Sequence, residues 1–154
     1  MSVLLTASLS AALPLSAASH VDVVKMRTEN RVNPLGIGTS TPRFSWQITS
    51  DRKGVVQTSY QILVASSREK LDRNEADLWD SGERNSDEQL WIPYQGKALL
   101  SGAQAYWKVR ITTNKGKSEW TEPQLFTIGL LGETKWSGTW IGLEDLQPGE
   151  QKGM

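Results

Sequence analysis

Short runs of alternating apolar and polar residues recur along this chain and restrict it to a fold built mainly of strands. The clearest run covers residues 43–49, where Phe44, Trp46 and Ile48 fall on one side and polar residues on the other. Successive side chains of a strand point to opposite faces, so this period of two predicts a strand with one buried face. No stretch keeps a helical period for three turns. The sequence therefore predicts an all-β protein.

Two further runs alternate in the same way, at residues 59–65 and 105–112. Leu63 and Ala65 make the second face of the former run apolar as well, which indicates a central strand. The side chains expected to point inward from these two runs are Tyr60, Ile62, Val64, Trp107, Val109 and Ile111. Weaker runs cover residues 21–27, 78–81, 89–94 and 124–128.

Turn-forming residues separate these runs. Glycine tolerates positive φ and proline fixes φ, so segments such as Asn33-Pro34-Leu35-Gly36 and Asn114-Lys115-Gly116 predict turns. Seven runs between residues 21 and 128 have the spacing of an immunoglobulin-like or fibronectin type III β-sandwich with about seven antiparallel strands. Residues 66–77 have helical character and predict a short helix or a loop crossing between the sheets.

Composition excludes several classes of function. Lys and Arg together number 17, as do Asp and Glu, so no net charge attracts the chain to nucleic acid. The chain has no Cys and a single histidine, His20, which leaves no thiolate site and no histidine-based triad or zinc site. The acidic residues lie in polar segments or beside turns. We therefore expect no catalytic residue, no cofactor and no metal.

The two ends of the chain differ from the sandwich at residues 19–128. Residues 1–18 contain no charged side chain and end in Ser16-Ala17-Ala18, which is typical of a secretory signal. This predicts export to the periplasm or the extracellular space. No run reaches the ~20 apolar residues that a membrane-spanning helix needs, so membrane insertion is not expected. Residues 129–154 are expected to be a linker into a further domain.

An ordered set of motifs along the chain resembles the opening of bacterial α-L-rhamnosidases of glycoside hydrolase family 78. The resemblance covers about residues 21–142. Its motifs are Arg27-Thr28-Glu29-Asn30, Asn33-Pro34-Leu35-Gly36-Ile37, Pro42-Arg43-Phe44-Ser45-Trp46, Gln57-Thr58-Ser59-Tyr60-Gln61-Ile62-Leu63-Val64-Ala65-Ser66, Leu78-Trp79-Asp80-Ser81-Gly82, Tyr106-Trp107-Lys108-Val109, Ser118-Glu119-Trp120-Thr121, Phe126, Gly129-Leu130-Leu131, Trp136 and Trp140-Ile141-Gly142.

The resemblance implies a multi-domain enzyme in which this sandwich is an accessory domain. Such enzymes place their chemistry on an (α/α)₆ barrel that this chain does not contain. They resemble inverting glycosidases, which use one carboxylic acid and one carboxylate, and both would belong to that barrel. The partners implied are the other domains of the parent glycosidase and rhamnose-containing glycans. The alternatives are a free-standing carbohydrate-binding module and an adhesion-type fibronectin module.

Seven tryptophans suggest different roles by position. Trp46 and Trp107 lie on apolar strand faces and are expected in the core. If Leu90, Ile92 and Tyr94 point inward, Trp91 points out, which makes Trp91 the candidate carbohydrate contact. Trp120 is expected to lie over Lys108 or Arg110 as a cation–π ladder on the outer face. Trp136 and Trp140 are expected at the junction with the next domain.

Overall fold

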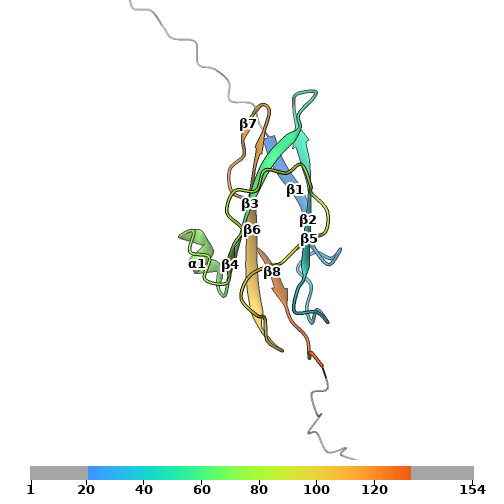
Figure 1. The fold of residues 1–154 in the computed structure, drawn as a ribbon, viewed down its shortest axis with the longest axis vertical. Helices are drawn as coiled ribbons and strands as arrows, with labels where there is room; N and C mark the ends of the chain where they lie inside the picture. The colour runs from blue at the N-terminus through green and yellow to red at the C-terminus, as the bar shows by residue number, and fades with distance from the viewer. Residues whose placement is uncertain (1–20, 133–154) are drawn as a thin grey trace, which may run out of the picture.

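The computed structural model describes residues 21–132, which form two antiparallel sheets packed face to face (Figure 1). One sheet has the order β1–β2–β5, and the other has the order β4–β3–β6–β7, with β8 also pairing with β6. The elements are β1 (Val21–Thr28), β2 (Arg43–Ser50), β3 (Gln57–Ala65), α1 (Arg68–Asp72), β4 (Trp79–Asp80), β5 (Ile92–Pro93), β6 (Gln104–Thr113), β7 (Gly116–Lys117) and β8 (Gln124–Thr127). The predicted all-β sandwich is confirmed.

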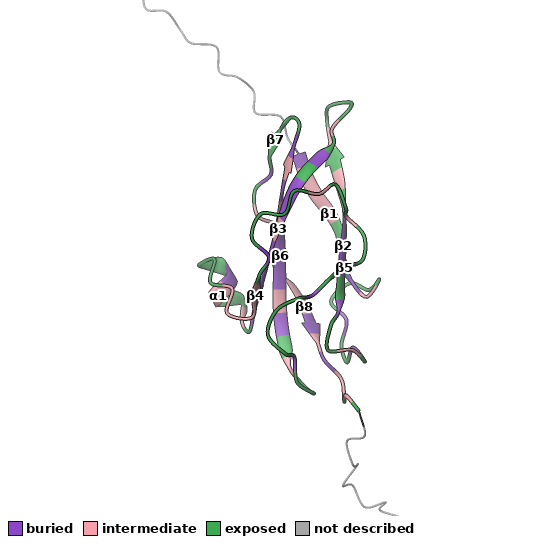
Figure 2. Cartoon of the chain, in the orientation of Figure 1, coloured by how far each residue is buried: buried purple, intermediate pink, exposed green. Residues whose placement is uncertain are grey.

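The core lies between the sheets, whose strands carry buried residues (Figure 2), and it is built on aromatic side chains. Trp46 of β2 and Trp107 of β6 are fully enclosed, as expected from their place on apolar strand faces. Phe44 lies between the sheets with its ring centroid 4.4 Å from that of Trp107 and 5.8 Å from that of Phe126. Aromatic pairs at these distances add to the free energy gained by burial alone.

The outer apolar side chains of β3 have a separate cover. Leu63 and Ala65 pack against Leu71 of α1, and all three are buried. Ser67 caps the start of the helix, since its hydroxyl accepts a hydrogen bond from the Lys70 amide, and the chain turns away at Asn74 with φ of 59°. β3 lies between β4 and β6, so the predicted central position is confirmed. The helix connects two strands of one sheet and does not cross to the other.

The segment expected to be a strand at residues 89–94 differs from the prediction. Only Ile92–Pro93 pairs as a strand, because Trp91 has a φ of 59° that interrupts an extended backbone. Its amide instead donates to the Ser45 hydroxyl at 3.0 Å. β7 is a two-residue strand that the sequence pattern did not indicate.

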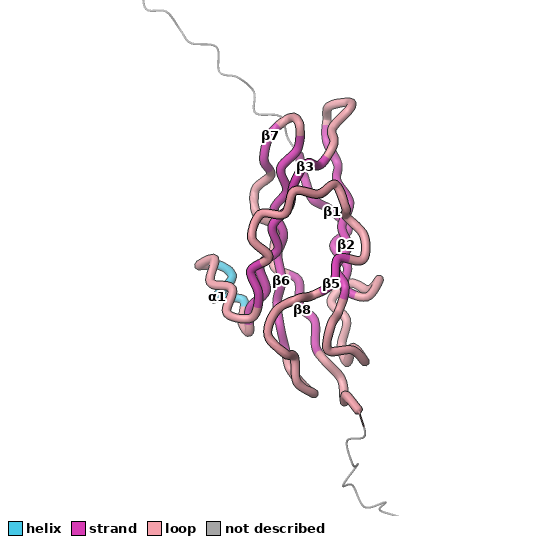
Figure 3. The backbone as a smooth tube through the Cα atoms, viewed as in Figure 1, coloured by secondary structure: helices cyan, strands magenta, loops and turns pink. Residues whose placement is uncertain are grey.

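A buried glutamine holds the connection that crosses from one sheet to the other at the β4 and β5 edge. Gln57 accepts a hydrogen bond from the Trp46 indole at 3.1 Å and donates to the carbonyls of Ser86 and Glu88 at 3.0 and 2.9 Å. The crossing segment is visible as the loop in front of the sandwich in Figure 3. Its backbone is thereby anchored to the core.

The described chain enters and leaves at opposite ends of the sandwich (Figure 1). β1 begins beside the end of β2, where Val21 pairs with Ser50. At the other end, the loop between β1 and β2 runs alongside the end of β8, where the Ile37 amide donates to the Thr127 carbonyl at 2.8 Å. Gly129 then donates to the Ile37 carbonyl at 2.8 Å, so this loop and the exit of the chain form one surface.

Candidate functional site

Trp91 lies at the surface, as expected of the candidate carbohydrate contact, but its neighbours are arranged differently from the prediction. Ile92 and Tyr94 point inward and are buried, whereas Leu90 is 64% exposed, so its predicted inward position is wrong. Trp91 itself is 41% exposed. A positive φ is rare for a bulky residue and costs of order 1–3 kcal/mol, so the surrounding contacts hold this indole in place.

A salt bridge supports Trp91 from one side. The Arg43 guanidinium lies 4.3 Å from the centroid of the Trp91 ring. Glu29 accepts from Arg43 Nε at 3.0 Å, from Nη2 at 2.8 Å and from the Arg43 backbone amide at 2.8 Å. The hydrogen bond from Arg43 lowers the pKa of Glu29, so this carboxylate stays ionised. The guanidinium thus covers part of the indole, while 41% of Trp91 remains exposed.

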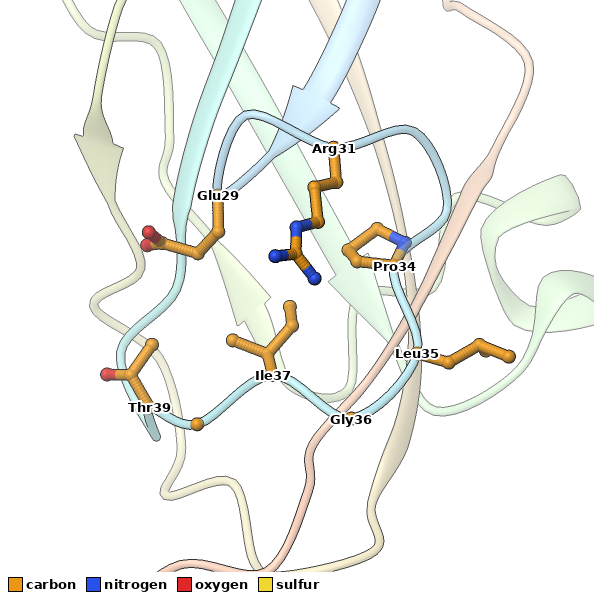
Figure 4. Close-up of a pocket in the computed structure, with 8 residues that line it drawn as sticks. Glu29, Arg31, Pro34, Leu35, Gly36, Ile37 and Thr39 are labelled. Atoms are coloured by element: carbon orange, nitrogen blue, oxygen red, sulfur yellow. The ribbon is translucent and has the colours of Figure 1, made fainter.

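A hollow adjoins this salt bridge in the loop between β1 and β2 (Figure 4). Its volume is about 520 Å³, and it is lined by Glu29, Arg31, Pro34, Leu35, Gly36, Ile37, Gly38 and Thr39. The Arg31 guanidinium points into it above Ile37. Glu29 is the one carboxylate in the lining, and its lowered pKa does not suit a general acid. The hollow offers a cation to an incoming group and no acid–base pair.

A second hollow lies at the open edge of the sandwich, near Trp79 of β4, and sequence reasoning missed it. Its volume is about 290 Å³, and its lining is Tyr60, Trp79, Arg84, Glu88, Ile92, Pro93 and Gln95. Burial raises the pKa of Tyr60, and the nearby Glu88 carboxylate raises it further. Trp79 packs against Phe44 and Tyr94, with ring centroids 6.3 and 5.4 Å away. No local pattern reveals this site, since its residues come from three separate segments.

The predicted cation–π ladder at Trp120 is confirmed. Arg110 lies 4.4 Å and Lys108 5.1 Å from the ring centroid, on the outer face of β6. Lys108 is buried under α1, and its ammonium donates to the Leu71 carbonyl and to Asn74 Oδ1. Burial lowers the pKa of Lys108. The hydrogen bonds of Lys108 hold α1 against the sheet. The cation–π contacts give Trp120 a structural role on this face.

Several positions singled out from the sequence lie outside the described residues. Trp136, Trp140 and the signal-like residues 1–18 are not among residues 21–132. Within that range, no group of three or more His, Cys, Asp or Glu side chains is arranged to hold a metal ion. The same residues contain no helix with the length and hydrophobicity needed to cross a membrane.

Curated relatives of this chain are α-L-rhamnosidases. An α-L-rhamnosidase of Formosa agariphila is 39% identical over 127 residues, which are 81% of this chain and 13% of that protein. An α-L-rhamnosidase of Streptomyces avermitilis is 39% identical over 124 residues, covering 80% of this chain and 12% of that protein. The chain thus spans about 13% of the length of the first of these relatives.

Solved structures of α-L-rhamnosidases contain a region with the same fold as this chain. The α-L-rhamnosidase of Streptomyces avermitilis complexed with L-rhamnose superimposes with a TM-score of 0.74 at 36% identity, over 80% of this chain and 12% of that one. The α-L-rhamnosidase from Dictyoglumus thermophilum superimposes with a TM-score of 0.73 at 35% identity, over 80% and 14%.

The family described as the Rha78A-like, N-terminal immunoglobulin domain matches residues 23–132. This range coincides with the two packed sheets and includes the loop that carries Glu29 and Arg31. The matched part of this chain corresponds to 12–14% of the length of the two solved α-L-rhamnosidases. The chain belongs to the Rha78A-like family of N-terminal immunoglobulin domains.

Proposed function

We propose that this domain is a structural module of an exported α-L-rhamnosidase and that hydrolysis takes place on a part of the enzyme outside it. The similarity to α-L-rhamnosidases over 81% of this chain but 13% of the relative carries this proposal. The hollow beside Glu29 supports it, since its carboxylate is held ionised by Arg43. An inverting hydrolase needs a second carboxyl group that can donate a proton.

Two assays test whether this domain is structural and hydrolysis takes place outside it. The isolated chain is expected to leave nitrophenyl α-L-rhamnoside intact, and turnover that survives repurification would overturn the proposal. The second assay compares the proposed parent enzyme with a variant from which residues 21–132 have been deleted. Deletion is expected to lower the melting temperature of the remaining enzyme. A remainder that keeps its full thermal stability contradicts the structural role.

Trp136 and Trp140 follow directly after the described sandwich. We propose that they lie at the junction with the next domain of the parent enzyme. The sandwich suits such a position because its two ends lie far apart (Figure 1), so it spans the space between neighbouring parts of a chain.

A weak saccharide contact at Trp91 is a second candidate role. Its strained backbone and the Glu29–Arg43 salt bridge hold the indole at the surface before any ligand binds. We propose that the exposed part of the indole stacks on the apolar face of a rhamnose unit. Calorimetric titration with rhamnose-containing glycans tests this, with Trp91→Ala as the variant and Leu90→Ala, a neighbour that is also exposed, as the control. Binding that is the same in both variants rejects the contact.

Residues 1–18 are proposed to direct export. Their lack of charge and the small residues at Ser16-Ala17-Ala18 support this. Fusion of residues 1–20 to a reporter that is active only outside the cytoplasm tests it, with a fusion lacking those residues as control. A reporter that stays inactive with the leader in place contradicts export.

A further inference from the structure

Three leucines remain uncovered at the end of the sandwich where the described chain leaves. Leu35 is 72%, Leu100 73% and Leu130 60% exposed. They come from the loop before β2, the loop before β6 and the residues after β8. Figure 4 shows the Leu35 side chain extending away from the centre of the hollow that this residue helps to line. Solitary exposed leucines are ordinary, whereas several on adjoining segments mark a surface that something covers.

Backbone hydrogen bonds place these three segments side by side. Gly129 donates to the Ile37 carbonyl at 2.8 Å, and Gly102 donates to the Ile128 carbonyl at 3.1 Å. The Leu131 amide donates to the Ser101 hydroxyl at 2.9 Å. Gly129 also lies so close to Gly36 that an added Cβ would come within 3.0 Å of the Gly36 carbonyl oxygen. The three leucines therefore belong to one end face.

The same end face contains a cation that the described fold does not use. Arg31 points into the hollow, and its guanidinium has no hydrogen bond or ion pair to any residue of the range 21–132. Glu29 also lines the hollow, but its carboxylate already accepts hydrogen bonds from the Arg43 guanidinium. A carboxylate entering beside Leu35 would meet an unpaired guanidinium, which binds carboxylates by two parallel hydrogen bonds.

The residues that follow have the chemistry to cover this face. Residues 133–154 contain Trp136, Trp140 and Ile141 as apolar groups and Glu144 and Asp145 as a pair of acids. Trp136 is four residues beyond Gly132, a reach of about 13 Å for an extended chain, and that is enough to return to Leu130. We propose that residues 133–154 pack on the end face, with the tryptophans over the leucines and a carboxylate on Arg31.

An occupant on the same chain is favoured over a second molecule. A short connection holds the tryptophans near the leucines at an effective concentration in the millimolar range. The contact deepens the junction proposed above for Trp136 and Trp140. The packing is proposed within one chain, however, so a negative result for this packing would leave the proposed role in an α-L-rhamnosidase intact.

Methyl NMR of the full chain tests the contact, because a tryptophan ring shifts the resonances of methyl groups that it covers. In the Trp136→Ala/Trp140→Ala variant, the methyl resonances of Leu35, Leu100 and Leu130 are expected to move, while those of Leu90 stay in place. Leu90 is a matched control, since it is 64% exposed but lies on the crossing segment. The substituted residues are not among residues 21–132, so the variant leaves every residue of the two sheets unchanged.

Two results would overturn the proposal. Leucine resonances that are unchanged in the double variant show that the tryptophans do not cover them. Resonances that move with protein concentration show that a second copy covers the face instead. Arg31→Gln is expected to shift the three leucines part of the way towards the double variant, with Arg84→Gln as control. An unchanged spectrum for Arg31→Gln rejects the carboxylate contact.

Discussion

Trp120 contacts two cations on the outer face of β6, with Arg110 at 4.4 Å and Lys108 at 5.1 Å from its ring centroid. Replacement by alanine removes both contacts and exposes the stem of a buried lysine. We expect Trp120→Ala to lower the free energy of unfolding by about 1–2 kcal/mol. Thermal denaturation followed by circular dichroism measures this. An unchanged melting temperature contradicts the ladder.

Glu29 and Glu75 each pair with an arginine, yet we expect them to differ in their contribution to stability. Glu29 also accepts the Arg43 backbone amide and positions the guanidinium under Trp91, whereas the Glu75 pair with Arg73 is solvent-exposed. Glu29→Gln is expected to cost about 1 kcal/mol and Glu75→Gln close to nothing. Urea denaturation of both variants provides the comparison. An equal loss in the free energy of unfolding for both variants would show that the contact of Arg43 with Trp91 adds nothing to stability.

At the scale of the element, Gly96 marks the tightest approach between the β4 edge and the segment after β5. A Cβ at this position would collide with the Leu78 carbonyl and the Trp79 side chain. Gly96→Ala is therefore expected to destabilise the sandwich by about 1–3 kcal/mol through overpacking. A Cβ added at Gly38 would have no neighbouring atom within 4 Å, so Gly38 serves as control. If Gly38→Ala lowers the melting temperature as much as Gly96→Ala, the steric explanation is wrong.

The strands that carry the core could be predicted from sequence because their signal is local. The period of two around Phe44 and Trp46 appears within a few residues, and the structure buries both. Trp91 shows where this fails: residues 89–94 look like a strand, but the hydrogen bond to Ser45 fixes a backbone that no pattern indicates. Arg43 and Glu29 are fourteen residues apart, so only the paired strands bring them together.

For the molecule as a whole, acid is expected to be the destabilising condition. Among residues 21–132, the pKa is lowered in the folded state for five carboxyl groups, namely Glu29, Glu69, Glu75, Asp77 and Glu83. Burial would raise the pKa of Asp77, but hydrogen bonds from Lys70 and Ser66 outweigh it and lower the value from 3.8 to about 2. Groups of this kind add stability above their unfolded pKa and lose it as the pH falls through the folded one.

The melting temperature is therefore expected to be steady between pH 7 and 5 and to fall between about pH 4 and 2. Differential scanning calorimetry across this range measures it. Asp77→Asn is expected to be less stable at pH 7 by about 1 kcal/mol and to lose less on acidification, since asparagine carries no titrating charge. A variant with the same pH profile as the wild type would remove Asp77 from the explanation.

The opposite placement of the two ends of the sandwich has a mechanical consequence. A pull between Val21 and Gly132 runs along the strands, since β1 starts at one end and β8 finishes at the other (Figure 1). Such a load shears the β1–β2 and β6–β8 ladders, so their hydrogen bonds share the force and do not open one after another. In a longer chain, the domain would transmit tension from one neighbour to the next with little extension.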